Sequence, residues 1–433
     1  MSLVIRRRRF VFKPEDLKRF IRRGEKSIPP VFVGRERILD DILAIADEAW
    51  LAESHILPGV TRILQGAPGV GKSATLAELA RERAPAGSTS HHPRILSLNS
   101  ADISDPGDIL VPLAHLVNPK AAPEFLSRIE KTRVAAGGVD AFGVRAGGRL
   151  ESTLSLADPR PALVEFGNWA RSLDPGIGIE GPIIIAIDEA QRFQRHNEDP
   201  LAKLLQGLHD STARLPLTLV LAGLSDTADR ARDMGLTRGL EIHMIGALHP
   251  DNVTRLMTGF CHRFGMDPRG HEARLAALAA PCEGWPRHLH AALAALAAAA
   301  LTTEGDLDRI DWDRVEAAAA AGRHRYYQGQ RSSMMEESAG LVASVLRDLR
   351  PGHRRSDVID SIRDHVRRAG PDAPTRMQLP AGMTPRALAD HLIHQGALQE
   401  TPDHAITCPI PSFRQHLIEE GGMSCGDGQG VTR

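Results

Sequence analysis

Residues 66–73 have the composition and spacing of a phosphate-binding loop. They read Gly-Ala-Pro-Gly-Val-Gly-Lys-Ser, which fits the pattern of a glycine, any four residues, a second glycine, a lysine and a serine or threonine. The glycines permit a tight turn in which successive backbone N–H groups point at phosphate oxygens. Lys72 would reach the β- and γ-phosphates of a nucleotide, and the Ser73 hydroxyl would bind Mg²⁺. The alternative is a glycine-rich turn that binds nothing.

The expected phosphate contacts extend over the whole loop and into the residue that follows it. These residues are Gly66, Ala67, Pro68, Gly69, Val70, Gly71, Lys72, Ser73 and Ala74.

An acidic pair could supply the second half of such a site. The apolar run 183–187 is followed directly by Asp188 and Glu189. A strand end would direct Asp188 towards the Mg²⁺ held by Ser73, and Glu189 could polarise an attacking water molecule. An unpaired buried carboxylate is costly, which favours this interpretation over two carboxylates that are merely exposed at a strand end.

The elements around these residues indicate an α/β fold. Residues 61–65 predict a short buried strand before the loop, and residues 74–81 are strong helix formers after it. Such a helix would direct the positive end of its dipole at the phosphate. Strands alternating with helices at this spacing predict a doubly wound P-loop fold with a parallel five-stranded sheet. The other predicted strands are 94–99, 182–187, 217–222 and 241–245.

Helices account for much of the remaining chain. Between the second and third strands they are predicted at 107–117, 122–134 and 160–172. The glycine-rich segment 136–148 in that interval could be a mobile functional loop or a simple hairpin. After the fifth strand, the predicted helices are 250–264, 271–280, 286–302 and 311–321, and they indicate an all-helical lid.

A third unit begins near residue 335. Its predicted elements are helices at 336–349, 356–369 and 384–396, strands at 397–401 and 405–409, and a last helix from Ser412. Helices followed by a small hairpin predict a winged helix.

Composition limits the class of protein. The 433 residues are 42% hydrophobic and 25% charged, which is typical of a soluble protein with two or three domains. No apolar run is long enough to span a membrane, and no apolar segment of a secretory signal follows the basic N-terminus. The four cysteines are far apart and match no metal-binding spacing. We expect a cytoplasmic protein with reduced thiols and no membrane partner.

Positive charge is concentrated at the N-terminus. Residues 1–28 contain ten lysines and arginines against three acidic residues, a net charge of +7 in a chain whose total is −1. This basic arm could contact DNA or an acidic protein face, or it could be a solvated terminus. Arginines of the third unit could contact DNA phosphates or could simply be solvated. They are Arg347, Arg350, Arg354, Arg355, Arg363, Arg367 and Arg368.

With the two nucleotide motifs in place, residues 28–325 resemble the AAA+ ATPases, and within them the origin-recognition or initiator-like clade. Residues 30–36 resemble the segment that wraps the adenine in that clade, which implies nucleotide contacts from Val33 and Arg35. Residues 284–287 resemble sensor 2, which implies that Arg287 reaches the γ-phosphate from a lid helix.

For two roles, the resemblance leaves more than one nearby residue as a candidate. It places sensor 1 after the fourth strand, where the family commonly has asparagine and this chain offers Ser225 or Asp226. It also implies an arginine finger that completes the site of an adjacent subunit, at Arg238, with Arg230 and Arg232 as competitors.

The resemblance implies an ATPase that binds ATP and Mg²⁺ and associates with copies of itself. Water would attack in line, with Glu189 as base and Lys72, Arg287 and Mg²⁺ stabilising charge. ATP binding and hydrolysis would be coupled to assembly or remodelling on DNA. The alternative is a nucleotide-gated signalling switch, or a regulator of a partner effector in phage defence or transposition, with slow turnover. The protein partner stays open.

The expected organisation has five parts. They are a basic arm at 1–28, an α/β nucleotide-binding domain at 29–248, a helical lid at 249–330, a winged helix at 335–420 and a flexible tail at 421–433.

Overall fold

The computed structural model forms two units. We call residues Arg35–Gly66 and Lys72–Ile245 the sheet unit, and residues Met1–Gly34, Ala67–Gly71 and Gly246–Arg433 the helical unit. The structure describes residues 11–24, 29–51, 60–81, 93–135, 158–173, 181–193, 198–210, 215–332, 338–401 and 403–423. The glycine-rich segment 136–148 lies outside these residues.

The sheet unit contains a five-stranded sheet in the order β2-β3-β4-β1-β5, in which every described pair is parallel. Near-continuous apolar runs such as Ile-Ile-Ile-Ala-Ile in β3 suit strands that are covered on both faces. The strands are β1 (Val60–Gln65), β2 (Arg94–Asn99), β3 (Ile183–Asp188), β4 (Leu217–Gly223) and β5 (Leu240–Met244). Each strand boundary lies within one residue of its predicted position, and the predicted parallel sheet is confirmed.

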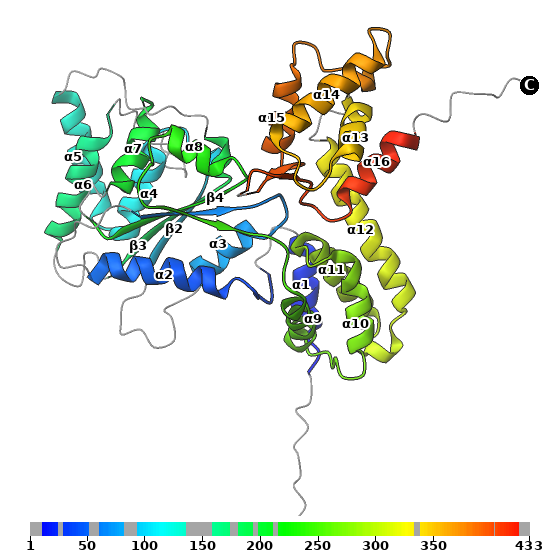
Figure 1. Cartoon of the computed structure of the whole chain (residues 1–433). Coiled ribbons are helices and arrows are strands. Elements are labelled where there is room, and N and C mark those ends of the chain that lie inside the picture. The colour runs from blue at the N-terminus through cyan, green and yellow to red at the C-terminus, as the bar shows by residue number, and fades with distance from the viewer. Residues whose placement is uncertain are drawn as a thin grey trace, which may run out of the picture. The chain divides into compact units, whose positions relative to one another are not determined.

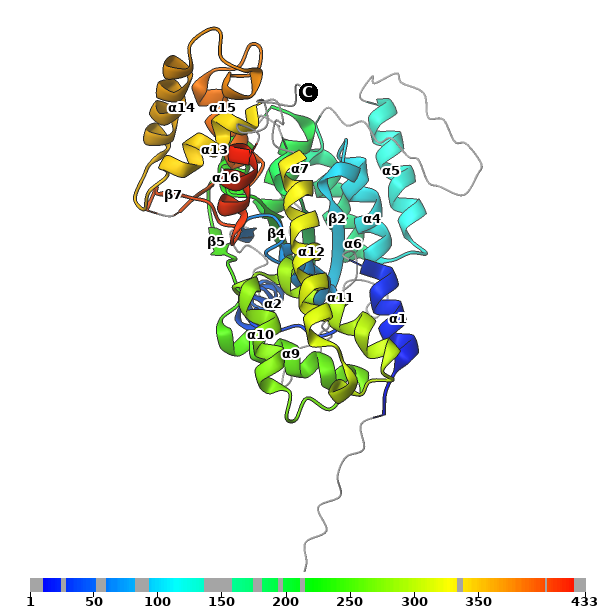
Figure 2. The ribbon, with the colours of Figure 1, turned by 90° about the vertical axis from the view of Figure 1, so that its right-hand side faces the viewer.

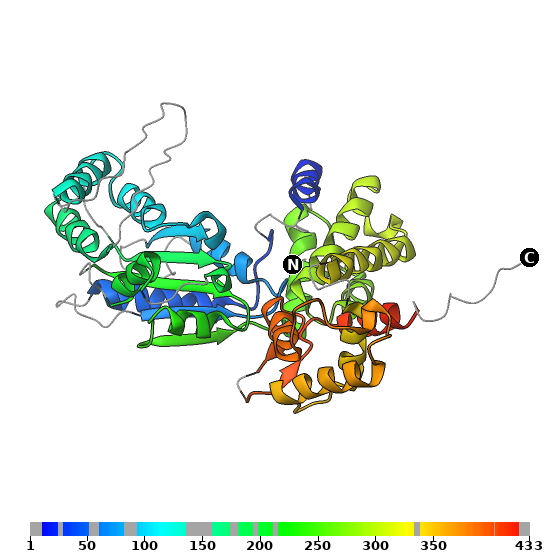
Figure 3. The same cartoon turned by 90° about the horizontal axis from the view of Figure 1, so that it is seen from above.

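Helices cover both faces of this sheet (Figure 1 and Figure 3). One face carries α2 (Glu36–Leu51) and α3 (Lys72–Arg81). The other face carries α4 (Gly107–Val117), α5 (Ala122–Ala135), α6 (Arg160–Ser172), α7 (Pro200–His209) and α8 (Thr227–Asp233). The larger apolar core lies on this second face, where strand residues pack on those five helices. With this core, the parallel strand ends are held rigidly at one edge of the sheet.

The first part of the helical unit is a bundle that includes an unexpected N-terminal helix. Its later helices are α9 (Pro250–Phe264), α10 (Glu272–Ala279), α11 (Pro286–Thr302) and α12 (Trp312–Ser332). Helix α1 (Pro14–Arg23) lies beside α11 (Figure 2) and buries Leu17 and Phe20 in the same core. The rings of Phe20 and Phe260 meet edge to face at 5.3 Å. Part of the basic segment is therefore a packed helix.

The C-terminal part of the helical unit has the order of elements of a winged helix. The antiparallel pair β6 (Gln399–Glu400) and β7 (Ile406–Thr407) follows three helices and precedes a fourth. The Ile406 N–H also donates to the His353 carbonyl at 2.6 Å, which ties the hairpin to the start of the second of these helices. The helices are α13 (Ala339–Asp348), α14 (Arg355–Ala369), α15 (Pro385–His394) and α16 (Phe413–Met423).

Candidate nucleotide site

The phosphate-binding loop leaves β1 at the edge where the parallel strands end. The Gly66 N–H donates to the carbonyl of Gly223, the last residue of β4, at 3.2 Å. Lys72 begins α3 and is buried, and its ammonium group donates to the Gly66 carbonyl at 2.8 Å. Burial lowers the pKa of Lys72 to about 8, although the carboxylates of Asp188 and Glu189 act in the opposite direction. The sheet unit thus holds a buried lysine under the influence of both acidic residues.

The loop backbone has the conformation that its glycines predict. Gly69 and Gly71 have φ angles of 77° and 101°, a region that favours glycine. Space also requires glycine at position 69, because a Cβ atom there would lie 2.9 Å from the Arg287 Cβ and 2.9 Å from the Tyr326 hydroxyl oxygen. These contacts lie within the helical unit, to which loop residues 67–71 belong.

Two groups of the helical unit bind carbonyls of the loop. The Arg287 N–H, near the start of α11, donates to the Gly69 carbonyl at 3.1 Å. The Tyr326 hydroxyl, on α12, donates to the Pro68 carbonyl at 2.9 Å. The Arg287 guanidinium lies over the Tyr326 ring, 5.4 Å from its centre. The bundle therefore holds the carbonyl groups of Pro68 and Gly69.

Tyr326 belongs to none of the motifs predicted from the sequence. The signal that could have found it is its rarity, because Tyr326 and Tyr327 are the only two tyrosines of the chain. Tyr327 points to the C-terminal part of the same unit, where its hydroxyl donates to the Pro411 carbonyl at 2.9 Å. His288 meets both tyrosine rings edge to face, and its burial lowers its pKa to about 4. His288 is therefore neutral at physiological pH.

The acidic pair lies where β3 ends. Asp188 is the last residue of the strand, and its carboxylate accepts the N–H of Glu189 at 2.9 Å. Glu189 has a φ angle of 57°, a strained left-handed conformation for a residue other than glycine. The Ser100 hydroxyl holds this turn by donating to the Glu189 carbonyl at 2.7 Å. Because β1, β3 and β4 are parallel, the loop and the acidic pair follow strand ends at the same sheet edge.

The two residues proposed for sensor 1 differ in their surroundings. The Ser225 hydroxyl is buried and has no hydrogen-bond partner among the described residues. Asp226 accepts an ion pair from Arg230 at 3.4 Å. The unpartnered hydroxyl follows β4, between the strands that lead to the loop and to the acidic pair. Buried oxygen atoms of both residues, the Ser225 hydroxyl and the Asp226 Oδ1, lie at this strand end, so both residues stay candidates for the polar contact to a ligand.

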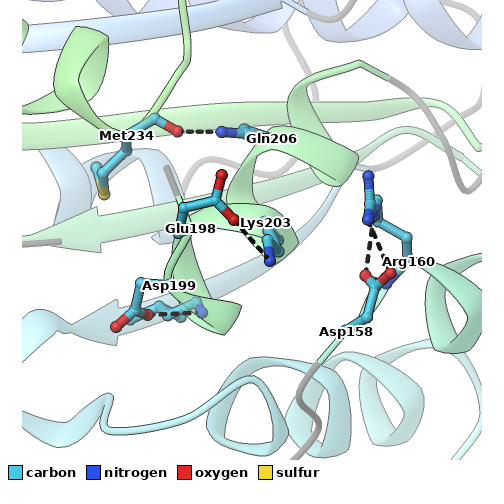
Figure 4. A network of polar contacts seen from close by, with 8 residues as sticks. Asp158, Arg160, Glu198, Asp199, Lys203, Gln206 and Met234 are labelled. Carbon is cyan, nitrogen blue, oxygen red and sulfur yellow. Dashed lines mark hydrogen bonds and ion pairs between the residues drawn. The ribbon is translucent and has the colours of Figure 1, made fainter. Parts of the chain in front are cut away.

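Arg238 lies in the turn between α8 and β5. Its side chain is exposed and makes no ion pair with another described residue, whereas Arg232 is paired with Asp229 at 2.7 Å. The turn is anchored from α7, where Gln206 donates to the Met234 carbonyl at 2.6 Å (Figure 4). The His209 ring, which is hydrogen-bonded to the Thr61 hydroxyl at 2.8 Å, lies beside the Arg238 backbone. A fixed backbone thus presents an exposed arginine, as an arginine finger would require.

The other residues predicted to contact the nucleotide or Mg²⁺ belong partly to the helical unit and partly to the sheet unit. In the helical unit, Val33 is buried and Arg287 is half-buried. In the sheet unit, Arg35 immediately precedes α2, and burial lowers its guanidinium pKa. Ser73, the second residue of α3, has an exposed side chain. Within the sheet unit, the structure gathers Lys72, Ser73, Asp188, Glu189 and Ser225 at one edge of the sheet.

A second group of potential metal ligands has a different explanation. Asp41, Glu241 and His243 offer ligand atoms within 4.8 Å of one another. The guanidinium of Arg62 already binds Asp41 at 2.8 Å and Glu241 at 2.9 Å. Its side chain is only 6% exposed, so these carboxylates compensate a buried charge and connect α2 to β1 and β5.

Comparison with solved structures identifies the fold. The ORC2 protein of Aeropyrum pernix, solved in ADPNP and ADP complexes, aligns over 95% of this chain and 98% of its own, with a TM-score of 0.53 and 14% identity. The chain has the AAA+ fold. The AAA+ arrangement here comprises the five-stranded parallel sheet, a helical C-terminal region and a short hairpin consistent with a winged helix. This agrees with the predicted fold.

Two other structures align over most of this AAA+ chain at lower scores. The RuvB Holliday junction branch migration motor of Thermotoga maritima covers 92% of it and 98% of its own chain, with a TM-score of 0.41 and 13% identity. The Aeropyrum pernix ORC1 protein in complex with DNA covers 92% and 95%, with a TM-score of 0.40 and 15% identity. No protein-family model and no curated protein matches the sequence. In the described part of the chain, no helix is both long and apolar enough to cross a membrane.

Proposed function

We propose that this chain is a Mg²⁺-dependent ATPase that couples ATP binding and hydrolysis to assembly or remodelling on DNA. One observation carries the proposal. The buried ammonium of Lys72 lies in a glycine loop at the edge of a parallel sheet and is influenced by the acidic pair that ends β3. This combination supplies a phosphate-binding cation, metal-binding oxygens and a base in one place.

The residues present fit ATP and Mg²⁺. The positive φ angles of Gly69 and Gly71 suit a cradle of backbone N–H groups, and Lys72 would move from the Gly66 carbonyl to the phosphates. The Ser73 hydroxyl and the Asp188 carboxylate are hard oxygen donors of the kind that Mg²⁺ prefers. Bound Mg²⁺ would neutralise charge on the phosphates.

The other predicted residues would complete the site. Glu189 would accept a proton from the attacking water, and Ser225 would donate its buried hydroxyl to a phosphate or to that water. Arg287 would contact the γ-phosphate, while Val33 and Arg35 would contact the adenine. Arg238 would act on the nucleotide of an adjacent copy of the chain, which requires self-association.

Replacing Glu189 by glutamine tests the chemical step. The amide keeps the size of the side chain but cannot accept the proton, so hydrolysis should become at least roughly tenfold slower while ATP still binds. Phosphate release and equilibrium ATP binding, measured on the same preparations, separate the two effects. Glu198→Gln is the matched control, because Glu198 is exposed and pairs with Lys203 at 3.3 Å on the surface. If Glu189→Gln turned over ATP like the wild type, the base would have to be another residue.

A nucleotide-gated switch that regulates a partner effector, with slow turnover, is the second candidate. It is favoured by the charge balance of α14, where arginines proposed to contact DNA already have acidic partners. Arg363 pairs with Asp360 on the same helix, and Arg367 pairs with Asp364 at 3.0 Å. Pairing of this kind reduces the positive charge available to phosphates.

Replacing the exposed cations of α1 distinguishes a DNA-associated ATPase from a nucleotide-gated switch. Arg19, Arg22 and Arg23 are exposed, so replacing all three by glutamine should leave the buried side chains of the helix in place. If α1 contacts DNA, the slope of log K against log salt should fall by about 0.9 for each phosphate contact that is lost. Binding of duplex DNA at several salt concentrations measures this slope.

The matched variant replaces Arg363, Arg367 and Arg368 of α14 in the same way. Its comparison with the α1 variant shows which surface contributes. Wild-type protein that does not bind DNA, or binds it without salt dependence, would contradict the DNA-associated function and support the switch.

A further inference from the structure

Gln191 joins the acidic pair to the strand beside it. It lies in the short 3-10 helix Ala190–Arg192 that follows Glu189, and it is only 5% exposed. Its Nε2 donates to the Glu189 Oε2 at 2.7 Å, and its Oε1 accepts the N–H of Leu224 at 3.2 Å. One buried amide therefore connects the carboxylate after β3 to the backbone after β4.

The surroundings leave this amide little freedom. A Cβ atom at Gly223 would lie 2.5 Å from the Gln191 Oε1 and 3.0 Å from its backbone nitrogen, so glycine is needed for β4 to approach this closely. The Glu189 carbonyl is held by the Ser100 hydroxyl at 2.7 Å. Both the backbone and one carboxylate oxygen of Glu189 are therefore fixed by neighbours.

The contacts use only one of the two carboxylate oxygens. Gln191 and, at 3.4 Å, the exposed guanidinium of Arg192 both meet the Oε2 of Glu189. No described residue of the chain binds the Oε1.

We propose that Gln191 is a positioning residue for ATP hydrolysis. By holding the Oε2 of Glu189, it orients the carboxylate so that the Oε1 can accept the proton of the attacking water. The bond to Leu224 fixes Gln191 relative to the end of β4, where Ser225 follows. This inference rests on the proposed function of Glu189 as the base.

Gln191→Leu removes both bonds of the amide. We expect kcat to fall roughly tenfold while KM and the ATP affinity stay within about twofold, because the lost interaction acts in the chemical step. Methionine has a similar length and no hydrogen-bond donor, so Gln191→Met should likewise lower kcat and leave KM unchanged. This variant is used if Gln191→Leu does not fold. Gln378→Leu is the control, since Gln378 also spans two backbone groups, the carbonyls of Pro371 and Ala373.

A double-mutant cycle with Glu189→Gln distinguishes positioning from a structural role. If Gln191 acts through the carboxylate, then Gln191→Leu should slow Glu189→Gln by less than about twofold, because the function that it supports is already lost. The same tenfold loss in both backgrounds, a parallel change of kcat and KM, or an unchanged kcat would each overturn the proposal. Normal hydrolysis by Glu189→Gln alone would instead refute the assignment of the base.

Discussion

Replacing Lys72 by alanine should lower the affinity for ATP by about a hundredfold. Hydrogen bonds to charged groups contribute roughly 1.5–3 kcal/mol, and each 1.4 kcal/mol changes an equilibrium constant tenfold. The Lys72 ammonium already donates to the Gly66 carbonyl within the loop, so it lies where bound phosphates would need a cation. Equilibrium titration with a fluorescent ATP analogue measures the loss.

The substitution is not expected to unfold the protein. Burial lowers the pKa of Lys72 to about 8, which means that the fold without nucleotide disfavours the charged ammonium. Lys203→Ala is the matched control in the same unit, because Lys203 lies on α7 and pairs with the exposed Glu198. A folded Lys72→Ala variant that binds ATP as tightly as Lys203→Ala would refute the assignment of the loop.

Replacing Arg238 by alanine should leave ATP affinity nearly unchanged and slow hydrolysis by about 10³-fold, the lower end of the range for arginine fingers. The side chain is exposed on an anchored turn and has no ion-pair partner among the described residues. A finger acts on the nucleotide of an adjacent subunit. Arg232→Ala is the control, because Arg232 lies in the preceding helix and is already paired with Asp229.

Mixing two inactive variants tests action between subunits. Arg238→Ala keeps an intact pocket, and Lys72→Ala keeps an intact finger, so assemblies that contain both should recover part of the lost activity. Steady-state phosphate release at a fixed total concentration, with co-assembly verified by size-exclusion chromatography, measures this recovery. Co-assembly without recovery would refute the assignment of Arg238 as an arginine finger. So would a wild-type ATP hydrolysis rate per chain that does not depend on protein concentration.

Local sequence patterns predicted much of the fold. The bounds of β2, α4, α9 and α11 agree with their predicted ranges, because caps, proline at the first turn and apolar periodicity act within each segment. Helix α12 shows where this reasoning fails. The prediction ended at residue 321, before Gly322, but the helix continues to Ser332. A Cβ atom at Gly322 would lie 2.9 Å from the Ala291 Cβ, so this glycine permits close packing of α12 on α11.

In the candidate site too, residues in local motifs were predictable, whereas residues that act through distant partners were not. The loop and the acidic pair were predictable because each is a contiguous motif beside its own strand. Gln191 and Tyr326 were not, since their roles depend on partners that are distant in sequence, Leu224 and Pro68. The packed helix α1 was missed because its ten residues include four cations and only three apolar side chains, of which Leu17 and Phe20 are buried. Tertiary packing decided its structure.

A calorimetric titration of ATP into the wild-type 433-residue chain, with Mg²⁺ and with a chelator, shows whether this chain binds the nucleotide as its magnesium complex. If the loop and the acidic pair form the site, ATP should bind saturably and in equimolar amount. Removal of Mg²⁺ should weaken binding, because Ser73 and Asp188 would lose the ion through which they act. Absence of saturable binding up to millimolar ATP, in protein shown to be folded, would refute a nucleotide site at the loop and the acidic pair.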